Sequence, residues 1–110
     1  MWVISKTRLQ EFWQTPGMAD AAGPLSAWYA HVVHAQWKNW SDVRLDFNSA
    51  DTVGNCTVFN IGGNKYRLVT RIFFQSHKVF ILKVMTHQEY DLGRWKEKCG
   101  CQSPPPGKRK

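Results

Sequence analysis

Several features that would place a protein in a membrane or outside the cell are missing from this sequence. It has no run of about 18 apolar residues, so it predicts no membrane-spanning helix. Its opening residues, MWVISKTRLQ, lack the apolar stretch of about 7–15 residues that a secretory signal peptide needs. We therefore expect a cytoplasmic protein that does not contact a membrane.

Cysteine is scarce as well. The chain has 3 cysteines, an odd number without the spacing of a disulfide framework, which fits a reducing compartment. Cys99 and Cys101 are separated by a single residue, which is too close for the usual zinc knuckle, and no second cysteine pair accompanies them. The sequence therefore predicts no metal site.

Acidic residues are few, and their distribution is uneven. The chain has 8 Asp and Glu against 15 Lys and Arg, which gives a net charge of +7. The excess lies in the second half and in the final Lys108-Arg109-Lys110, and no acidic residue occurs between positions 60 and 87. A basic half on a small domain favours a polyanion such as nucleic acid as the partner, although many small basic domains carry such charge only for solubility.

The length and the composition predict one folded domain. A chain of 110 residues has room for one compact domain and not for two. Its 43% of hydrophobic residues, including 6 Trp and 6 Phe, can build a core without disulfides or a metal. We expect the domain over residues 1–98 and a flexible, Pro-rich, basic tail over residues 99–110.

Hydrophobic periodicity and turn residues predict the order of the elements. An opening strand at 2–5 is followed by a helix at about 7–14, which Thr15-Pro16-Gly17 ends, and by an amphipathic helix at about 24–37. A single helical turn opens near Ser41. Strands follow at about 55–61, 65–74 and 78–85, and a helix at 87–98 closes the domain. This order indicates an α+β domain with two helices packed on one face of a curved antiparallel sheet.

The last two predicted strands separate cationic from apolar residues. Alternation places on one side Tyr66, Leu68, Thr70 and Ile72, and on the other side Lys65, Arg67, Val69 and Arg71. In the next strand one side is apolar and carries Phe80, Leu82 and Val84, and Lys83 lies on the other side. A face exposed to solvent would also be polar, but it would normally include Glu and Asp, so we favour a phosphate-binding face.

RNA cleavage without a metal requires particular groups. One group removes a proton from the 2′-hydroxyl, one stabilises the charged phosphorane, and one protonates the leaving 5′-oxygen. Histidine is the usual side chain for either proton transfer, and His87 follows the last predicted strand beside the cationic face. Arg67 offers a planar donor fork for the phosphate, Lys65 adds a point charge, and Tyr90 can stack on a base or donate a hydrogen bond. Taken alone, His87 is more simply explained as a neighbour of a helix N-cap without a chemical role.

Two segments carry a resemblance to a known family. Residues 53–68 (VGNCTVFNIGGNKYRL) resemble the central motif of HigB toxins, and residues 86–91 (THQEYD), followed by Trp95, resemble the ending typical of the family. The opening Val3-Ile4-Ser5 and the region from Trp37 to Asp42 also resemble the family pattern, so the resemblance covers about residues 1–97. It implies a fold of the RelE superfamily and an endoribonuclease that stops translation by cleaving messenger RNA, usually on the ribosome. It also implies no metal or organic cofactor, a HigA-type helix-turn-helix antitoxin as partner, and contact with operator DNA only through the antitoxin complex.

The resemblance also assigns roles to residues. Arg67 corresponds to the arginine that holds the scissile phosphate, His87 to a catalytic His or Arg, and Tyr90 to an aromatic residue that places the substrate. We expect further contacts with RNA from Asn60, Asn64, Lys65, Arg71, Lys83 and Lys96. Gly62 and Gly63 are expected to allow the turn between two strands, and Asp91 to orient the last helix.

Two other functions remain open. A protein that binds RNA without cleaving it would use the same cationic strands, because phosphate affinity requires no proton-transfer group. A protein-interaction module would instead use exposed tryptophans, with Trp28, Trp37 and Trp40 as anchors, although a place in the hydrophobic core is the simpler explanation of these three.

Overall fold

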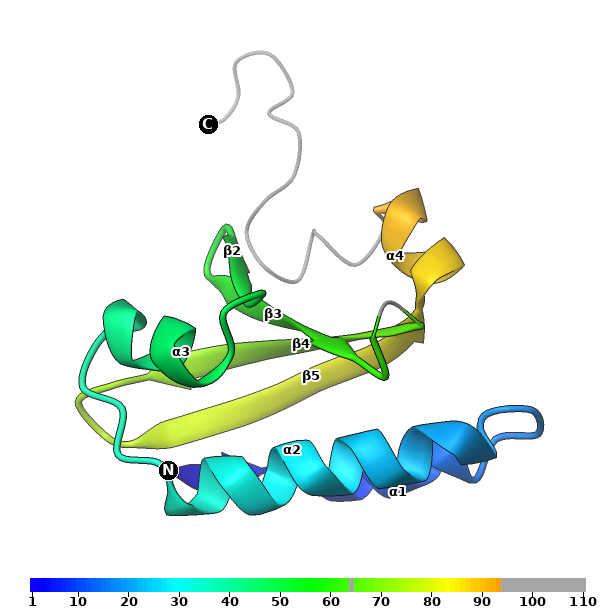
Figure 1. The fold of residues 1–110 in the computed structure, drawn as a ribbon, viewed down its shortest axis with the longest axis horizontal. Helices are drawn as coiled ribbons and strands as arrows, with labels where there is room; N and C mark the ends of the chain where they lie inside the picture. Colours follow the sequence, from blue (N-terminus) through cyan, green and yellow to red (C-terminus); the bar gives the residue numbers. More distant parts are fainter. Residues whose placement is uncertain (64, 94–110) are drawn as a thin grey trace, which may run out of the picture.

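The computed structural model describes residues 1–63 and 65–93. Its elements (Figure 1) are β1 (Trp2–Ile4), α1 (Thr7–Trp13), η1 (Ala19–Ala21), α2 (Ala22–His34), α3 (Trp40–Asp46), β2 (Asp51–Val53), β3 (Cys56–Ile61), β4 (Tyr66–Phe73), β5 (Lys78–Thr86) and α4 (His87–Leu92). Predictions on Asn64, Trp95, Lys96, Cys99, Cys101, the end of the last helix and the tail lie outside the described residues.

The five strands form one sheet in the order β1-β5-β4-β3-β2. The predicted α+β class is confirmed, but the prediction of a purely antiparallel sheet is wrong. β1 pairs with β5 in parallel, with Trp2 opposite Lys78, while the other pairs are antiparallel. A parallel pair needs a long crossover connection, and almost the whole domain lies between β1 and β5.

The short edge strand β2 was not predicted. It pairs with β3 through a hairpin in which Val53 lies opposite Cys56, and Gly54 at the turn has a φ of +58°. The strand is only three residues long and largely exposed, so it carries no hydrophobic alternation by which sequence analysis could find it.

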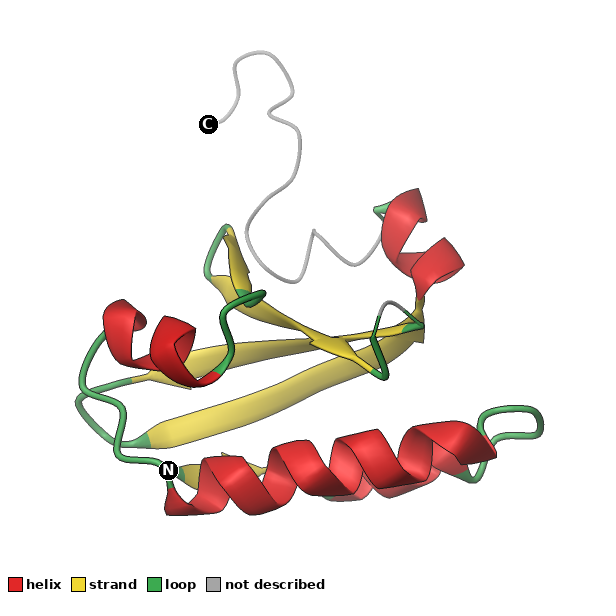
Figure 2. Ribbon diagram, in the orientation of Figure 1, coloured by secondary structure: helices red, strands yellow, loops and turns green. Residues whose placement is uncertain are grey.

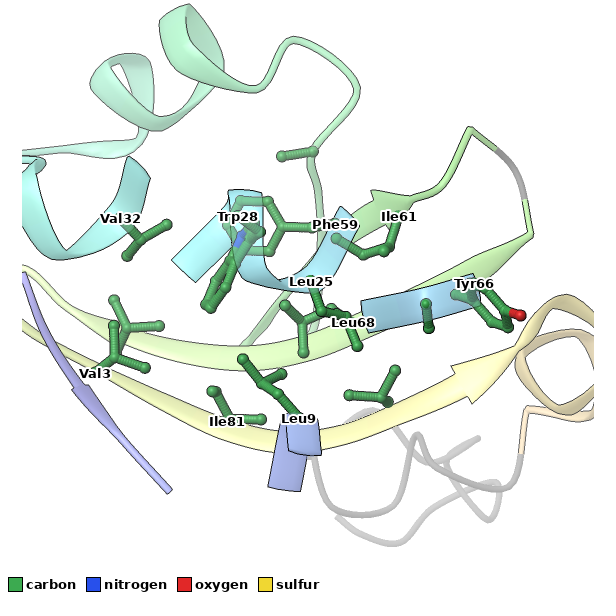
Figure 3. Close-up of a cluster of buried hydrophobic side chains, with 14 of the residues drawn as sticks. Val3, Leu9, Leu25, Trp28, Val32, Phe59, Ile61, Tyr66, Leu68 and Ile81 are labelled. Carbon is green, nitrogen blue, oxygen red and sulfur yellow. The ribbon is translucent and has the colours of Figure 1, made fainter. Parts of the chain in front are cut away.

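The main core lies between the sheet and the two long helices. α1 and α2 run side by side across one face of the sheet (Figures 1 and 2). Leu9, Leu25 and Val32 from these helices meet Leu68 and Ile81 from the strands, and all are almost completely buried (Figure 3). This burial supplies most of the driving force for the fold, since each large apolar side chain removed from water contributes about 1.5–3 kcal/mol.

The tryptophans confirm the core interpretation for two of the three proposed anchors. Trp28 and Trp37 are each 2% exposed, and Trp40 is half-buried against the same core. α2 ends at His34, so Trp37 enters the core from the following loop, where its indole Nε1 donates to Asp46 at 2.8 Å.

No helix in residues 1–63 and 65–93 is long and apolar enough to cross a membrane.

A register shift in β5 changes which of its residues face the core. Val69 pairs with Lys83 and Thr70 with Ile81, so Leu82 is an extra residue opposite β4, as in a β-bulge. Strict alternation after Val79 and Ile81 would bury residue 83, but Val84 is buried instead and Lys83 faces the other way. The prediction that Lys83 and Val84 face opposite sides of the sheet is therefore right. Phe80 and Leu82 were predicted on the same side as Val84, but they are not among the buried residues of the main core.

Candidate functional site

The face of the sheet turned away from α1 and α2, which we call the open face, holds the candidate site. Asn60 lies opposite Arg67 on β3 and β4, and Arg67 lies opposite Met85 on β5. Directly opposed residues share a face of the sheet, so Asn60 and Arg67 lie next to each other.

The open face is less polar than predicted, because a second small hydrophobic cluster lies within it. This cluster consists of Cys56, Val58, Val69 and Met85, all at most 3% exposed. Val53, Leu82 and Tyr90 pack against its rim. Cys56 is disulfide-bonded, which the odd cysteine count did not lead us to expect. The cationic groups of the open face are therefore arranged around an apolar floor.

Arg67 and Tyr90 contact each other at one edge of this floor. The guanidinium carbon of Arg67 lies 5.3 Å from the centre of the Tyr90 ring, and its Nη1 donates to the carbonyl oxygen of Tyr66 at 3.1 Å. Burial raises the pKa of Tyr90, and the charge of Asp51 raises it further, against the opposing effect of Arg67. At neutral pH the phenol therefore keeps its proton and can donate a hydrogen bond.

α4 places Tyr90 through a capping box at its first turn. Thr86 Oγ1 accepts a hydrogen bond from the backbone N–H of Glu89 at 3.2 Å, and Glu89 Oε1 accepts from the backbone N–H of Thr86 at 3.3 Å. The pattern Thr-x-x-Glu is the sequence signature of this cap. Gly93 follows the helix in the left-handed conformation, with a φ of +75°, so α4 ends at Leu92.

His87 opens α4 and pairs with Asp91. Its Nδ1 lies 2.9 Å from Asp91 Oδ2, one helical turn further on, and the His87 side chain is 47% exposed. His87 lines a shallow cleft of about 310 Å³, which it shares with Lys65, Tyr66 and Asp20. Arg67 and Tyr90 do not line this cleft. The predicted catalytic residues therefore occupy two neighbouring places, with Tyr90 beside Arg67 on the open face and His87 in the cleft at the start of α4.

Lys65 is not on the open face with Arg67, contrary to the predicted alternation. β4 begins only at Tyr66, and the Lys65 Nζ reaches Asp20 Oδ2 at 2.8 Å, on the side where Tyr66 is buried. The Tyr66 hydroxyl donates to the other oxygen of Asp20. These hydrogen bonds, first that from Lys65, lower the pKa of Asp20, and the same contacts with Asp20 raise the pKa of Lys65 and of Tyr66.

The other two predicted strand contacts differ in their surroundings. Lys83 is exposed, and its Nζ lies 3.8 Å from Glu89 Oε2. Arg71 is half-buried with its guanidinium carbon 5.1 Å from the Phe73 ring centre, and its Nε is buried without a hydrogen-bond partner among the described residues. Arg71 therefore packs against the sheet, whereas the Lys83 side chain extends into solvent beside Glu89.

Carboxylates from outside positions 60–87 accompany the cations. Asp20, Glu89 and Asp91 lie beside Lys65, Lys83 and His87 respectively. The absence of acidic residues between positions 60 and 87 therefore did not predict the charge of the folded surface. Sequence reasoning missed Asp20 entirely, and no local signal could have found it, because it lies 45 positions before Lys65.

The turn between β3 and β4 has the predicted glycine requirement. Gly62 and Gly63 have φ values of +61° and +72°, a region that side chains other than glycine rarely adopt. The turn brings the backbone of Lys65 close to α4, where the His87 N–H donates to the Lys65 carbonyl oxygen at 3.1 Å. No group of three or more His, Cys, Asp or Glu in residues 1–63 and 65–93 is arranged to hold a metal ion.

Comparison with known proteins gives the family. The model of the HigB toxin family, described as the RelE-like toxic component of a toxin-antitoxin system, matches residues 21–93. The chain belongs to the HigB toxin family. The matched segment contains Arg67, His87 and Tyr90, and most of the sheet that positions them.

Similar curated proteins carry the same family name. The chain is 59% identical over 35 residues to the mRNA interferase toxin HigB of Escherichia coli (strain K12), and equally to the mRNA interferase HigB of Escherichia coli O157:H7 and of Shigella flexneri. Each match spans 32% of this chain and 34% of the relative, so the chain covers about a third of the length of these relatives.

Proposed function

We propose that this chain is the toxin of a toxin–antitoxin pair and an endoribonuclease that cleaves messenger RNA. The observation that carries the proposal is the contact between Arg67 and Tyr90 beside Asn60, within the segment that the family model matches. A guanidinium supplies a planar donor fork for a phosphate, and a tyrosine ring can stack on an unpaired base. Together they suit a single RNA strand better than a small anionic ligand.

In the proposed mechanism Arg67 stabilises the charge that develops on the phosphorane. The guanidinium remains charged at all relevant pH values, and its contact with Tyr90 limits the orientations that it adopts. Tyr90 keeps its proton because its pKa is raised. It therefore donates a hydrogen bond to a phosphate oxygen or stacks on a neighbouring base, and it does not act as a base itself.

His87 is the proposed proton-transfer group, and Asp91 positions it. A carboxylate at 2.9 Å from Nδ1 favours the tautomer with the proton on Nδ1, which leaves Nε2 to take the proton of the 2′-hydroxyl. The 2′-oxygen then bonds to the phosphorus, the bond from the phosphorus to the 5′-oxygen breaks, and the imidazolium gives its proton to the leaving 5′-oxygen. His87 and Tyr90 are three residues apart on α4, so their Cβ atoms are separated by about 5–6 Å. An RNA strand crossing the start of α4 would reach both side chains.

Lys65 and Lys83 are proposed to bind neighbouring phosphates. Each already lies beside a carboxylate, Asp20 or Glu89, and both pairs are largely exposed to water. Exposed pairs of this kind contribute only about 0–1 kcal/mol, so a phosphate can take the place of the carboxylate at little cost. Asn60, Arg71, Asn64 and Lys96 stay proposed contacts with RNA.

The remaining parts of the proposal concern the biological setting. We propose that cleavage takes place on the ribosome, in the cytoplasm, and without a metal ion or an organic cofactor. The proposed partner is a HigA-type helix-turn-helix antitoxin, which would bring the toxin to operator DNA. The proposed fold is the RelE-like arrangement of helices on a curved sheet, with the domain spanning residues 1–98.

A cell-free translation assay tests the proposed activity. Purified protein is added to a translating message, and cleavage is mapped by primer extension. We expect Arg67→Ala and His87→Ala to lose cleavage by about 100- to 1,000-fold, which corresponds to the loss of about 2.7–4 kcal/mol of transition-state stabilisation. Arg44→Ala is the matched control, because it removes an exposed cation from α3, a helix that contributes Val43 to the main core and no residue to the apolar floor of the open face.

The same assay separates the alternatives. Intact messages under translation arrest would contradict the nuclease and favour a protein that binds RNA without cleaving it. Wild-type cleavage by both Arg67→Ala and His87→Ala would contradict the assigned site. A parallel reaction with free RNA and no ribosomes tests ribosome dependence. Cleavage of free RNA at the same rate would contradict the proposal that cleavage requires the ribosome.

A further inference from the structure

A second groove lies at the end of the sheet away from α4. It has a volume of about 1100 Å³ and lies between β1, the end of α2 and the turn that joins β4 to β5. Trp2 and His77 line it from the sheet, and Tyr29, Val33 and Lys38 from α2 and the loop that follows. These segments lie at the N-terminal end of the ribbon in Figure 1, with α4 at the opposite end of β5.

This groove is separate from the candidate catalytic site. Trp2 pairs with Lys78, the first residue of β5, whereas Thr86, its last residue, leads into α4. Nine residues of strand span about 30 Å at about 3.3 Å per residue. One bound group therefore cannot occupy both places unless it extends along the whole sheet.

The groove combines an apolar lining with positive charge. Trp2 is 67% exposed, an unusual position for so large an apolar side chain, and Val33 and Ala35 continue the apolar surface. Lys6 and Lys38 line the groove, and no Asp or Glu of residues 1–63 and 65–93 does. The surface thus attracts a ligand that carries negative charge and bulky apolar groups together.

The carboxylates nearest to this groove do not neutralise its lysines. Asp42 accepts a hydrogen bond from the backbone N–H of Lys38 at 2.8 Å, and Asp46 accepts from the indole of Trp37 and pairs with His31 at 3.1 Å. Both carboxylates line a neighbouring hollow and not the groove itself, although Lys38 lines both. The ammonium groups of Lys6 and Lys38 have no ion pair among the described residues.

The contacts of the two aromatic rings favour a peptide over a nucleic acid. Lys6 Nζ lies 5.2 Å from the centre of the Tyr29 ring, and Lys78 Nζ lies 5.6 Å from that of Trp2. A base that stacked on these faces would have to displace an ammonium group from each. An apolar side chain can instead enter between Trp2 and Val33, while carboxylates on either side of it meet the lysines.

We propose that this groove docks an acidic segment of a partner protein, with a bulky apolar side chain inserted beside Trp2. The inference does not depend on the proposed nuclease activity, because it uses no residue of the open face. The positive charge of the groove requires a negatively charged segment. The apolar lining requires Leu- or Phe-like side chains within that segment.

Titration of the ¹⁵N-labelled full chain tests the proposal. The probe is a short synthetic peptide of Glu and Asp interspersed with Leu and Phe. We expect it to shift the backbone amides of Val33, Gln36 and His77 and to leave those of Arg67 and Tyr90 unchanged. Two control probes are the same peptide with every acidic residue replaced by Lys, and a short single-stranded RNA blocked by 2′-O-methyl groups.

Variants then identify the contacts. The double charge reversal Lys6→Glu with Lys38→Glu should weaken peptide binding at least about tenfold, since two attractive charge pairs become repulsive. Trp2→Ala, which changes an exposed side chain, should weaken it similarly. Arg44→Glu is the matched control and should bind as the wild type does, because Arg44 does not line the groove.

Each result decides the question. Shifts confined to the groove, and lost in the double reversal and in Trp2→Ala, support an acidic docking site. Equal binding of the Lys-containing peptide, an absence of shifts at the groove, or groove shifts caused by the RNA instead of the peptide would each overturn it.

Discussion

The capping box of α4 provides a direct test of how the candidate site is held in place. Thr86→Ala removes the hydroxyl that accepts from the Glu89 N–H, and α4 has only six residues, none of which is fully buried. Loss of an N-cap of this kind costs about 1 kcal/mol. Because α4 contributes no residue to the main core, we expect the cost to appear as local opening of α4, with the rest of the fold unchanged.

The expected magnitude can be measured. A change of about 1 kcal/mol lowers the ratio of closed to open α4 by about fivefold. Native-state hydrogen exchange should therefore accelerate about fivefold at the amides of Tyr90 and Asp91, and stay unchanged at Leu68 in the core. If the proposed site is right, RNA cleavage falls by no more than a similar factor, far less than for Arg67→Ala.

The control and the refuting result are both specific. Thr86→Ser keeps the hydroxyl and should behave nearly as the wild type does. Equal exchange in Thr86→Ala and the wild type would show that the cap does not limit the opening of α4. A fall in global stability of the same size in urea denaturation would show that α4 unfolds together with the core, and either outcome refutes the reasoning.

Three further predictions concern stability and its dependence on pH. Leu68→Ala empties a fully buried position and should cost about 2.7–5 kcal/mol, measured by urea denaturation. Gly63→Ala should cost about 1–2 kcal/mol by the same measurement, because its φ is +72°, whereas Gly23→Ala in α2 should be neutral or slightly stabilising. The pKa of Asp20 is lowered in the fold, chiefly by Lys65, so its contribution is present above pH 3.8 and is lost as the pH falls further. The wild type should therefore lose more stability on acidification than Asp20→Asn, and parallel curves in acid titrations followed by circular dichroism would contradict this.

Local patterns predicted the parts of the fold that depend on local residues. The alternation of Tyr66, Arg67 and Leu68 follows the pleat of β4, and the structure places Tyr66 and Leu68 in the main core as expected. The positive φ values at Gly62 and Gly63 follow from the tight turn that joins β3 and β4. These features depend on neighbours in sequence, so the periodicity of the sequence predicts them.

Features that depend on distant segments were not predictable in the same way. Leu82 and Lys83 fit a regular strand equally well, and nothing local marks the bulge that turns Lys83 as well as Leu82 away from the main core, where regular alternation would bury residue 83. The parallel pairing of β1 with β5 and the contact of Asp20 with Lys65 join segments that the chain brings together only on folding. The position of His87 in the cleft with Lys65, rather than beside Arg67, has the same origin.

The carboxylates around the candidate site have a consequence for how it would bind RNA. If the cations were unpaired, every contact would add a new attraction, and the folded protein would carry their mutual repulsion. Here Asp20 and Glu89 already lie beside Lys65 and Lys83, so binding exchanges a carboxylate for a phosphate and changes the charge around each lysine little. The lysines would then contribute modestly to affinity and mainly to the placement of the strand. Specific stabilisation of the reacting phosphate would fall to Arg67, whose contacts with Tyr90 and with the Tyr66 carbonyl hold it on the open face.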